Sequence, residues 1–169
     1  VPGYTGYLAF WVNQEIMDEV GIESIDTKED FMKYMEAVSK DGRFGYGGSW
    51  EKTYASNEIA QFVNMFGGDY FDWTKEENKE AIQFLHDLVA NKETPVDQIA
   101  DKYDQMNPKI NDGKYGCWFM WGLGTDYAKA DMLGADKIHM AMVPDFSGNG
   151  ERAIFTDSWN YVLNSASKN

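Results

Sequence analysis

Carboxylates and imidazoles are the side chains of this sequence that could perform acid–base or metal chemistry, and their spacing favours neither. His86 and His139 are the two histidines, and no second histidine or cysteine stands at a metal-ligand spacing from either of them. Glu51 and Asp157 could supply the carboxylate pair that glycoside hydrolysis requires, but nothing in the sequence brings them together. The sequence therefore predicts no metal site and no hydrolytic pair.

Motifs for nucleophilic catalysis and for phosphate binding are also absent from the sequence. Ser49, Ser158 and Cys117 lack the neighbouring residues that mark an activated nucleophile, and no Gly-x-x-x-x-Gly-Lys loop occurs. The loop from Asp145 to Gly150 resembles a calcium loop only faintly, because the closing bidentate glutamate is missing. We therefore expect no catalytic residue, no metal and no cofactor.

Aromatic side chains are the feature of the composition that indicates binding. Six tryptophans, ten tyrosines and ten phenylalanines make up 15% of the 169 residues. A buried tryptophan needs a partner for its indole N–H, so a large number of them is difficult to place in a core of this size. Trp11 and Trp118 lie within apolar runs and are expected in the core. We expect some of the others to face a ligand.

Charge and cysteine content limit the possible partners. The formal net charge is −13, whereas nucleic acids and anionic membrane surfaces attract positively charged proteins, so neither is expected as a partner. No apolar run approaches the ~18 residues of a membrane helix. The first residues lack a secretion signal, and we expect that segment to lie outside this chain. Cys117 stands alone and is expected to be a small apolar core residue.

The order of the expected elements predicts an α/β domain with a mixed β-sheet flanked by helices. The clearest helix is amphipathic and follows a capping box that begins at Thr74. A second capping box begins at Thr27. The other periodic patterns predict strands over 7–12, 44–46, 115–121, 137–143, 152–156 and 160–163, and helices over 14–20, 27–39, 56–66, 98–107 and 125–132. The segment 47–54 is rich in glycine and polar residues and is expected to be a loop.

Six short motifs, in this order, resemble the extracellular solute-binding proteins of sugar ABC transporters, the maltose-binding-protein-like family. They are VPGY with LAFWVNQE (1–4 and 8–15), EVGI with TKEDF (19–22 and 27–31), GGDYF (67–71), AIQFLHDLV (81–89), NDGKYGC (111–117) and DSWNYVL (157–163). The sequence departs from the family pattern at Asp157-Ser158, where glycines are usual, at Ile110 and at Gly116-Cys117. These departures concern the class of ligand rather than the fold.

The resemblance implies a periplasmic-binding-protein-like lobe of type II. Residues 1–169 would form one α/β domain, mainly the C-terminal lobe of a two-lobe protein, with the first lobe and the C-terminal helices outside this chain. The resemblance further implies a monomer that is not an enzyme. It would capture a sugar or oligosaccharide in the interlobe cleft and deliver it to the permease subunits of an ABC transporter. The implied location is extracytoplasmic, either periplasmic or as a membrane-anchored lipoprotein.

The matching motifs also imply which residues bind the ligand, all of them on loops beyond the ends of strands. Trp159 matches a tryptophan that stacks on sugars in the family, and Asp157 is its near neighbour. Tyr4 lies in the opening loop, near the hinge between the lobes. The remaining candidates come from two loops and are Trp50, Glu51 and Tyr54 in the first and Trp121 and Asp126 in the second.

Three other interpretations stay open from the sequence. A receptor for a peptide, amino acid, polyamine or organic anion would use the same fold, and an acidic aromatic cleft could hold a cation. A carbohydrate-active enzyme would need two carboxylates at glycosidase separation. A structural or adhesive domain would leave Trp50, Trp121 and Trp159 apart.

Overall fold

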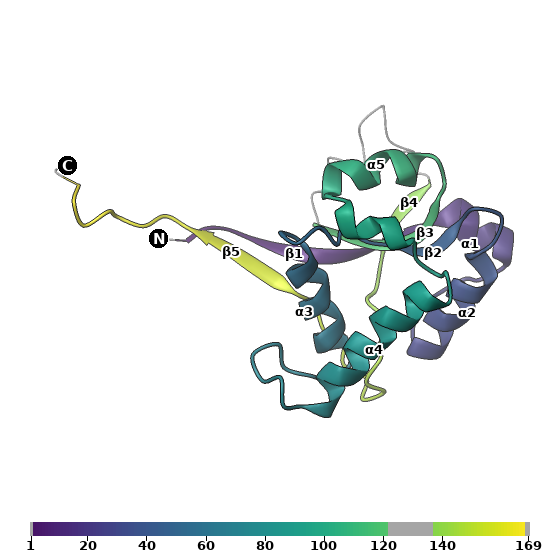
Figure 1. The fold of residues 1–169 in the computed structure, drawn as a ribbon, viewed down its shortest axis with the longest axis horizontal. Coiled ribbons are helices and arrows are strands. Elements are labelled where there is room, and N and C mark those ends of the chain that lie inside the picture. Colours follow the sequence, from purple (N-terminus) through teal and green to yellow (C-terminus); the bar gives the residue numbers. More distant parts are fainter. Residues whose placement is uncertain (1, 122–136, 168–169) are drawn as a thin grey trace.

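A five-stranded mixed sheet with helices on both faces forms the body of this computed structural model (Figure 1). The structure describes residues 2–121 and 137–167. The strands are β1 (Pro2–Asn13), β2 (Phe44–Gly47), β3 (Tyr115–Trp121), β4 (Ile138–Ala141) and β5 (Thr156–Asn160). The helices are α1 (Gln14–Val20), α2 (Lys28–Val38), α3 (Ala55–Met65), α4 (Glu76–Ala90), the 3₁₀ helix η1 (Val96–Ala100) and α5 (Tyr103–Asn111).

Strand β1 is the centre of the sheet, and its two halves have different neighbours. The second half pairs antiparallel with β3 on one side, where Leu8 lies opposite Trp121, and with β4 on the other. The first half pairs with β5 alone, with Tyr4 opposite Trp159. These paired first-half residues of β1 and β5 form a two-stranded arm that projects from the body (Figure 1). Strand β2 runs parallel to β3, so the sheet is mixed, as predicted.

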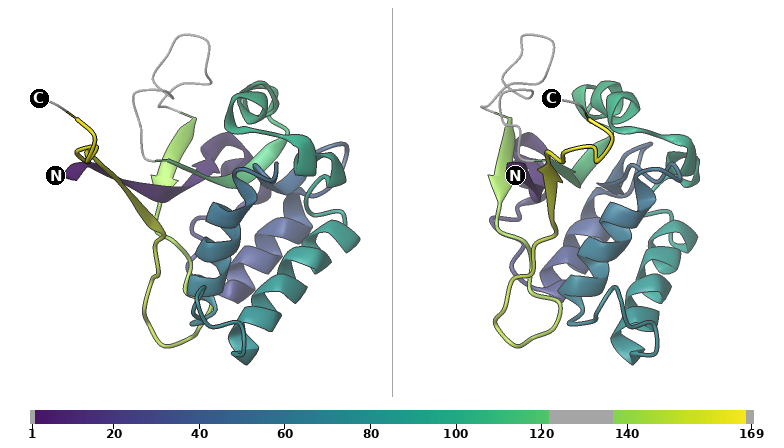
Figure 2. Two further views of the ribbon diagram at one scale, coloured as in Figure 1. Left: turned by 60° about the vertical axis from the view of Figure 1, so that its left-hand side comes forward. Right: turned by 90° about the vertical axis from the view of Figure 1, so that its left-hand side faces the viewer.

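Successive side chains of a strand point to opposite faces of the sheet, and β1 supplies a separate core on each face. Leu8, Phe10 and Val12 pack into the larger core with helices α1 to α4, whereas Ala9 and Trp11 pack under α5. Figure 2 shows α2, α3 and α4 together on one side of the sheet and α5 on the other. Nine of the buried residues of the larger core are phenylalanine or tyrosine.

The core positions predicted for tryptophan and cysteine are confirmed. Trp11 is 5% exposed and Trp118 is fully buried. The indole N–H of Trp11 donates to the carbonyl of Met120 at 3.2 Å. Without this hydrogen bond, burial would leave the indole N–H unsatisfied. Cys117 is a buried free thiol on β3, and burial raises its pKa well above the usual value.

Most predicted helices are present, and their local signals account for them. The Thr27 capping box forms, because Thr27 Oγ1 accepts from the Asp30 N–H and the Asp30 carboxylate accepts from the Thr27 N–H. Gly21 ends α1 in the left-handed conformation with φ of 70°. The helix predicted over 125–132 lies outside the described residues.

Several predicted boundaries are wrong for identifiable reasons. The strands predicted over 152–156 and 160–163 are replaced by one strand, β5, because the first half of β1 provides its pairing partner. Thr74 does not cap α4: Lys75 occupies the cap position without a side-chain bond, and the Thr74 hydroxyl donates to Asp72 at 2.6 Å instead. The helix predicted over 98–107 is split into η1 and α5, because Asp101 has an extended backbone.

The aromatic packing of the larger core predicts a large difference between two phenylalanine substitutions. Phe62 is fully buried, and its ring centroid lies 5.6 Å from those of both Tyr46 and Phe119. We expect Phe62→Ala to lower the free energy of unfolding by about 3–5 kcal/mol, because it leaves a cavity in this cluster. Phe71 is 94% exposed, and Phe71→Ala should change the free energy by about 0.5 kcal/mol or less. Urea denaturation measures both; equal losses would contradict the described core.

Candidate ligand-binding site

A cavity of about 630 Å³ lies where the arm leaves the body of the protein. Its volume is within the range of small-molecule binding sites. The lining comes from the arm, the end of β3, the loop before α3, and the first turns of α3 and α5. The lining residues are Tyr4, Thr5, Gly6, Tyr7, Thr53, Tyr54, Asn57, Tyr103, Trp121, Asp157 and Trp159.

Aromatic rings form most of the cavity wall. Tyr4 and Trp159 stack across the arm, with centroids 6.1 Å apart and planes 16° from parallel. The ring centroids of Tyr54, from the loop before α3, and Tyr103, at the start of α5, lie 4.6 Å apart. Trp121 lies beside Gly6, where a Cβ atom would come within 3.2 Å of the indole, so the absence of a side chain lets the ring rest against β1.

Polar groups stand between these rings. Asp157 supplies the one carboxylate among the described lining residues, and Thr53 supplies a hydroxyl. The Asn57 amide donates to the Tyr103 hydroxyl at 3.4 Å. Burial raises the pKa of Tyr103 to about 12, so this phenol stays neutral at physiological pH. Rings beside hydroxyl, amide and carboxylate groups suit a ligand with an apolar face and a polar rim.

Five of the eight side chains predicted to bind ligand lie together in this cavity. They are Tyr4, Tyr54, Trp121, Asp157 and Trp159. Asp126 lies outside the described residues. Trp121 and Trp159 thus share one site, whereas Trp50 does not line it.

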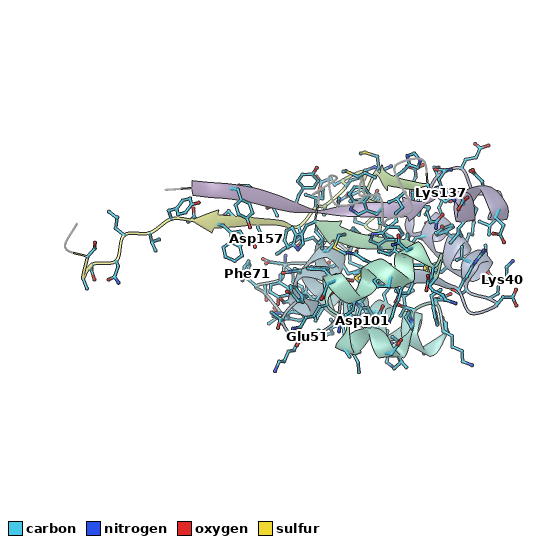
Figure 3. All side chains as sticks on the ribbon, turned by 90° about the horizontal axis from the view of Figure 1, so that it is seen from above. Lys40, Glu51, Phe71, Asp101, Lys137 and Asp157 are labelled. Atoms are coloured by element: carbon cyan, nitrogen blue, oxygen red, sulfur yellow. The ribbon has the colours of Figure 1, made fainter. Side chains whose placement is uncertain are left out.

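Trp50 and Glu51 support the cavity wall instead of lining it. The indole N–H of Trp50 donates to the buried Glu58 carboxylate at 3.0 Å, and the ring packs against the larger core. The exposed Glu51 carboxylate accepts from the Thr53 N–H at 2.9 Å, and hydrogen bonds from Thr53 lower its pKa. Both side chains therefore hold the turn that leads to Tyr54. Since Asp157 lines the cavity and Glu51 does not, the pair considered for glycoside hydrolysis is not assembled there (Figure 3).

Six lining residues were not predicted from the sequence. Thr5, Gly6 and Tyr7 belong to the arm, and the strand predicted over 7–12 included Tyr7 but neither Thr5 nor Gly6. The predicted binding residue Tyr4 was the signal that could have identified them, because its neighbours in the chain lie at the same cavity. The remaining three are Thr53, Asn57 and Tyr103, and no motif marks them.

Glu58, on α3, is a fully buried carboxyl group directly behind the cavity wall. Its Oε1 accepts from the Ser49 N–H at 2.7 Å, and its Oε2 accepts from the Trp50 indole and from the Tyr46 hydroxyl. These bonds favour the ionised form, but desolvation outweighs them, and the pKa of Glu58 is raised to about 7.

The described residues contain no group of three histidine, cysteine or acidic side chains that could hold a metal ion. His86 and His139 are both exposed. In the loop that faintly resembles a calcium site, the Asp145 carboxylate accepts from the Ser147 hydroxyl at 2.8 Å and from two glycine N–H groups. These hydrogen bonds stabilise the loop and lower the pKa of Asp145. Among the helices that the structure describes, none is long and apolar enough to cross a membrane.

A family model described as bacterial extracellular solute-binding protein matches residues 1–169, the whole chain. This chain belongs to that family. The resemblance seen in the six sequence motifs is thereby confirmed at the level of the family. The family's description places its members outside the cytoplasm.

Relatives of this solute-binding protein include carbohydrate receptors. An arabinooligosaccharide-binding protein of Halalkalibacterium halodurans is 33% identical over the aligned region, which covers 73% of this chain and 30% of the relative. A solute-binding protein of an ABC transporter from Agrobacterium vitis S4, solved with bound D-mannitol, superposes with a TM-score of 0.82 at 19% identity. Maltose-bound MalE3 of T. maritima superposes with a TM-score of 0.82 at 18% sequence identity.

The solved structures establish the fold of this solute-binding protein. The superpositions cover 99% and 94% of this chain, which confirms the periplasmic-binding-protein-like α/β fold expected from the motifs. They cover 43% of each solved chain. The chain therefore spans less than half the length of the relatives that it matches.

The buried carboxyl group gives a pH-dependent stability that a neutral substitution should remove. The unfolded chain releases the Glu58 proton near pH 4.5, whereas the folded protein keeps it to about pH 7, so the contribution of Glu58 to the free energy of unfolding falls between these pH values. Relative to the wild type, Glu58→Gln should gain stability across this window, by on the order of 3 kcal/mol at most. Urea denaturation at pH 5 and pH 8 measures the change.

Glu80→Gln is the matched control for this measurement, because Glu80 is exposed on α4. Its stability should follow the wild type at both pH values. Parallel pH profiles for the wild type and Glu58→Gln would contradict a raised pKa at Glu58.

Proposed function

We propose that this protein captures a sugar or oligosaccharide, without altering it, and delivers it to the permease of an ABC importer. The observation that carries the proposal is the cavity in which Tyr4, Trp121 and Trp159 lie beside the Asp157 carboxylate. The arabinooligosaccharide-binding relative and the structures with bound D-mannitol and maltose support this class of ligand.

The chemistry of the cavity suits a sugar ring. One face of a sugar ring carries C–H groups, and its edge carries hydroxyls. Trp159 is 62% exposed, so an indole surface is available for the C–H face, and such stacking contributes about 1 kcal/mol beyond the burial of area. The Asp157 carboxylate can accept from ring hydroxyls in charge-assisted hydrogen bonds, which are stronger than neutral ones.

The proposed mechanism is closure of two lobes over the ligand. Tyr4 and Trp159 are exposed on the cavity side of the arm, and a second lobe that covered them would desolvate the ligand between two surfaces. A ligand that contacts both lobes shifts the population towards the closed form, which the permease would recognise. In this proposal the receptor acts as a monomer outside the cytoplasmic membrane, either in a periplasm or as a surface lipoprotein.

The rival functions predict different observations. An acidic aromatic site could instead hold a polyamine or a cationic peptide. An enzyme would release products from an oligosaccharide, but the described cavity lining holds one carboxylate rather than the two that hydrolysis uses. Incubation with oligosaccharides followed by chromatography distinguishes capture from turnover, since capture leaves the oligosaccharide intact.

A thermal-shift panel tests the class of ligand on the complete protein. The panel contains arabinotriose, maltose, D-mannitol, amino acids and spermidine. A specific ligand at 100 times its dissociation constant should add about 2.7 kcal/mol to the stability of the folded state. We expect a carbohydrate to give the largest increase in melting temperature. Stabilisation by spermidine or an amino acid alone would keep the receptor function and overturn the ligand.

Removal of the stacking ring tests the proposed role of the arm. Trp159→Ala should weaken carbohydrate binding about tenfold, because it removes a stacked indole worth on the order of 1.4 kcal/mol. Trp73→Ala is the control, since Trp73 is a half-exposed tryptophan outside the cavity lining. Isothermal titration calorimetry measures both affinities. Unchanged binding by Trp159→Ala, or an equal loss in Trp73→Ala, would remove Trp159 from the site.

A further inference from the structure

The buried Glu58 carboxylate is the point to which the loop of residues 48–54 is attached. This loop carries Thr53 and Tyr54 into the cavity wall, and Asn57, next to Glu58 on α3, also lines the cavity. Two N–H groups of the loop, the Ser49 amide and the Trp50 indole, donate to Glu58. The hydrogen bonds of the buried Glu58 side chain thus hold the part of the cavity wall formed by Thr53 and Tyr54.

The backbone beside Glu58 is shaped to let Trp50 reach it. A Cβ atom at Gly48 would lie 2.5 Å from the Trp50 indole nitrogen and 2.8 Å from Glu58 Oε2. These distances are too short for real contacts, so the indole can cross this point of the chain only because residue 48 is glycine. The contact between Trp50 and Glu58 is therefore built into the path of the loop.

The other side of the loop is held by groups that do not titrate. The Gly48 N–H donates to the Gln98 side-chain carbonyl at 2.7 Å, and the Trp50 N–H donates to the Gln98 main-chain carbonyl at 3.1 Å. The Ser49 hydroxyl and the Glu51 N–H donate to the main-chain carbonyl of Asp101. On this side the hydrogen bonds are the same at every physiological pH, so Glu58 is the attachment that can change.

The groups around Glu58 leave its charge without a cationic partner among the described residues. Tyr46 of β2 and Tyr103 of α5 interact electrostatically with Glu58, and Cys117 of β3 interacts electrostatically with Tyr46. Burial raises the pKa of all three, so they stay neutral near pH 7. On the Gln98 side of the loop, Lys109 pairs with the carboxylates of Asp101 and Asp97.

We propose that Glu58 is a positioning residue for the ligand cavity: its ionised carboxylate holds the 48–54 loop, and protonation loosens the wall formed by Thr53 and Tyr54. The reason is a shortage of acceptors. Trp50 and Tyr46 both donate to the same oxygen, Oε2, and a proton on that oxygen would compete with them. The hydrogen bond from the Trp50 indole, which holds the loop, is therefore strongest when Glu58 is charged.

The consequence for binding rests on the proposed function. If only the ionised form has the binding-competent wall, the apparent affinity is reduced by the fraction of protein in that form. The pKa of Glu58 is raised to about 7, so most of the protein is ionised at pH 8 and about a tenth at pH 6. Affinity should therefore fall about tenfold from pH 8 to pH 6.

The attachment itself is tested without ligand, by nuclear magnetic resonance of the complete ¹⁵N-labelled protein. Between pH 5.5 and 8.5, the Ser49 amide and the Trp50 indole resonances should shift with a midpoint near pH 7. Glu58→Gln should abolish the shift, and the exposed control Glu80→Gln should retain it. Resonances that do not titrate in the wild type, or that titrate equally in Glu58→Gln, would overturn the proposal.

A second variant tests the same attachment while the carboxyl group stays in place. Trp50→Phe leaves the carboxyl group in place but removes one hydrogen bond that lowers its pKa. The midpoint of the Ser49 amide titration should therefore move to higher pH. An unmoved midpoint would show that the indole does not stabilise the charged form.

Ligand binding is then measured by calorimetry at pH 8 and pH 6, with arabinotriose or maltose as the probe. We expect about tenfold weaker binding at pH 6 in the wild type and equal affinities at the two pH values in Glu58→Gln. Equal affinities in the wild type would overturn the link between Glu58 and the ligand. If neither sugar binds at either pH, the proposed ligand class fails, and the resonance titration alone decides the role of Glu58.

Discussion

The hydrogen bonding of β1 is the constraint on which the position of the cavity depends. Its second half is bonded on both sides and buried between two cores, so it cannot slide without moving both. Its first half is bonded to β5 alone and continues from the buried half without a break. The body therefore fixes the direction and the register of the arm, and Tyr4 and Trp159 stand over the end of β3 for this reason.

The buried half of the fold could be predicted from local signals, whereas the arm could not. Apolar runs identified β3 and the second half of β1, and the capping box at Thr27 and the glycine at position 21 identified helix ends. The segment Gly3–Gly6 has weak strand propensity by itself and becomes a strand because β5 pairs with it. Such pairing joins distant parts of the sequence, and no local pattern encodes it.

The candidate site was predicted in part, and the limit was the direction of side chains. Motif positions placed Tyr54 and Trp50 on one loop, but the sequence does not say which of them faces outward. Glu58 did leave a signal: it lies one turn before Phe62, on the apolar face of α3, where an acid must be buried with donors around it. Tyr103 left none, since its helix was predicted with the wrong bounds.

The two walls of the cavity differ in how freely they can be remodelled. One extra residue between Tyr4 and Tyr7 would send the Tyr4 ring to the opposite face, away from Trp159, because side chains alternate along a strand. The 48–54 loop meets no such restriction, since extra residues near its tip leave the attachments to Gln98 and Glu58 in place. New ligand preferences should therefore arise most readily in the loop, with the arm serving as a platform that stays the same.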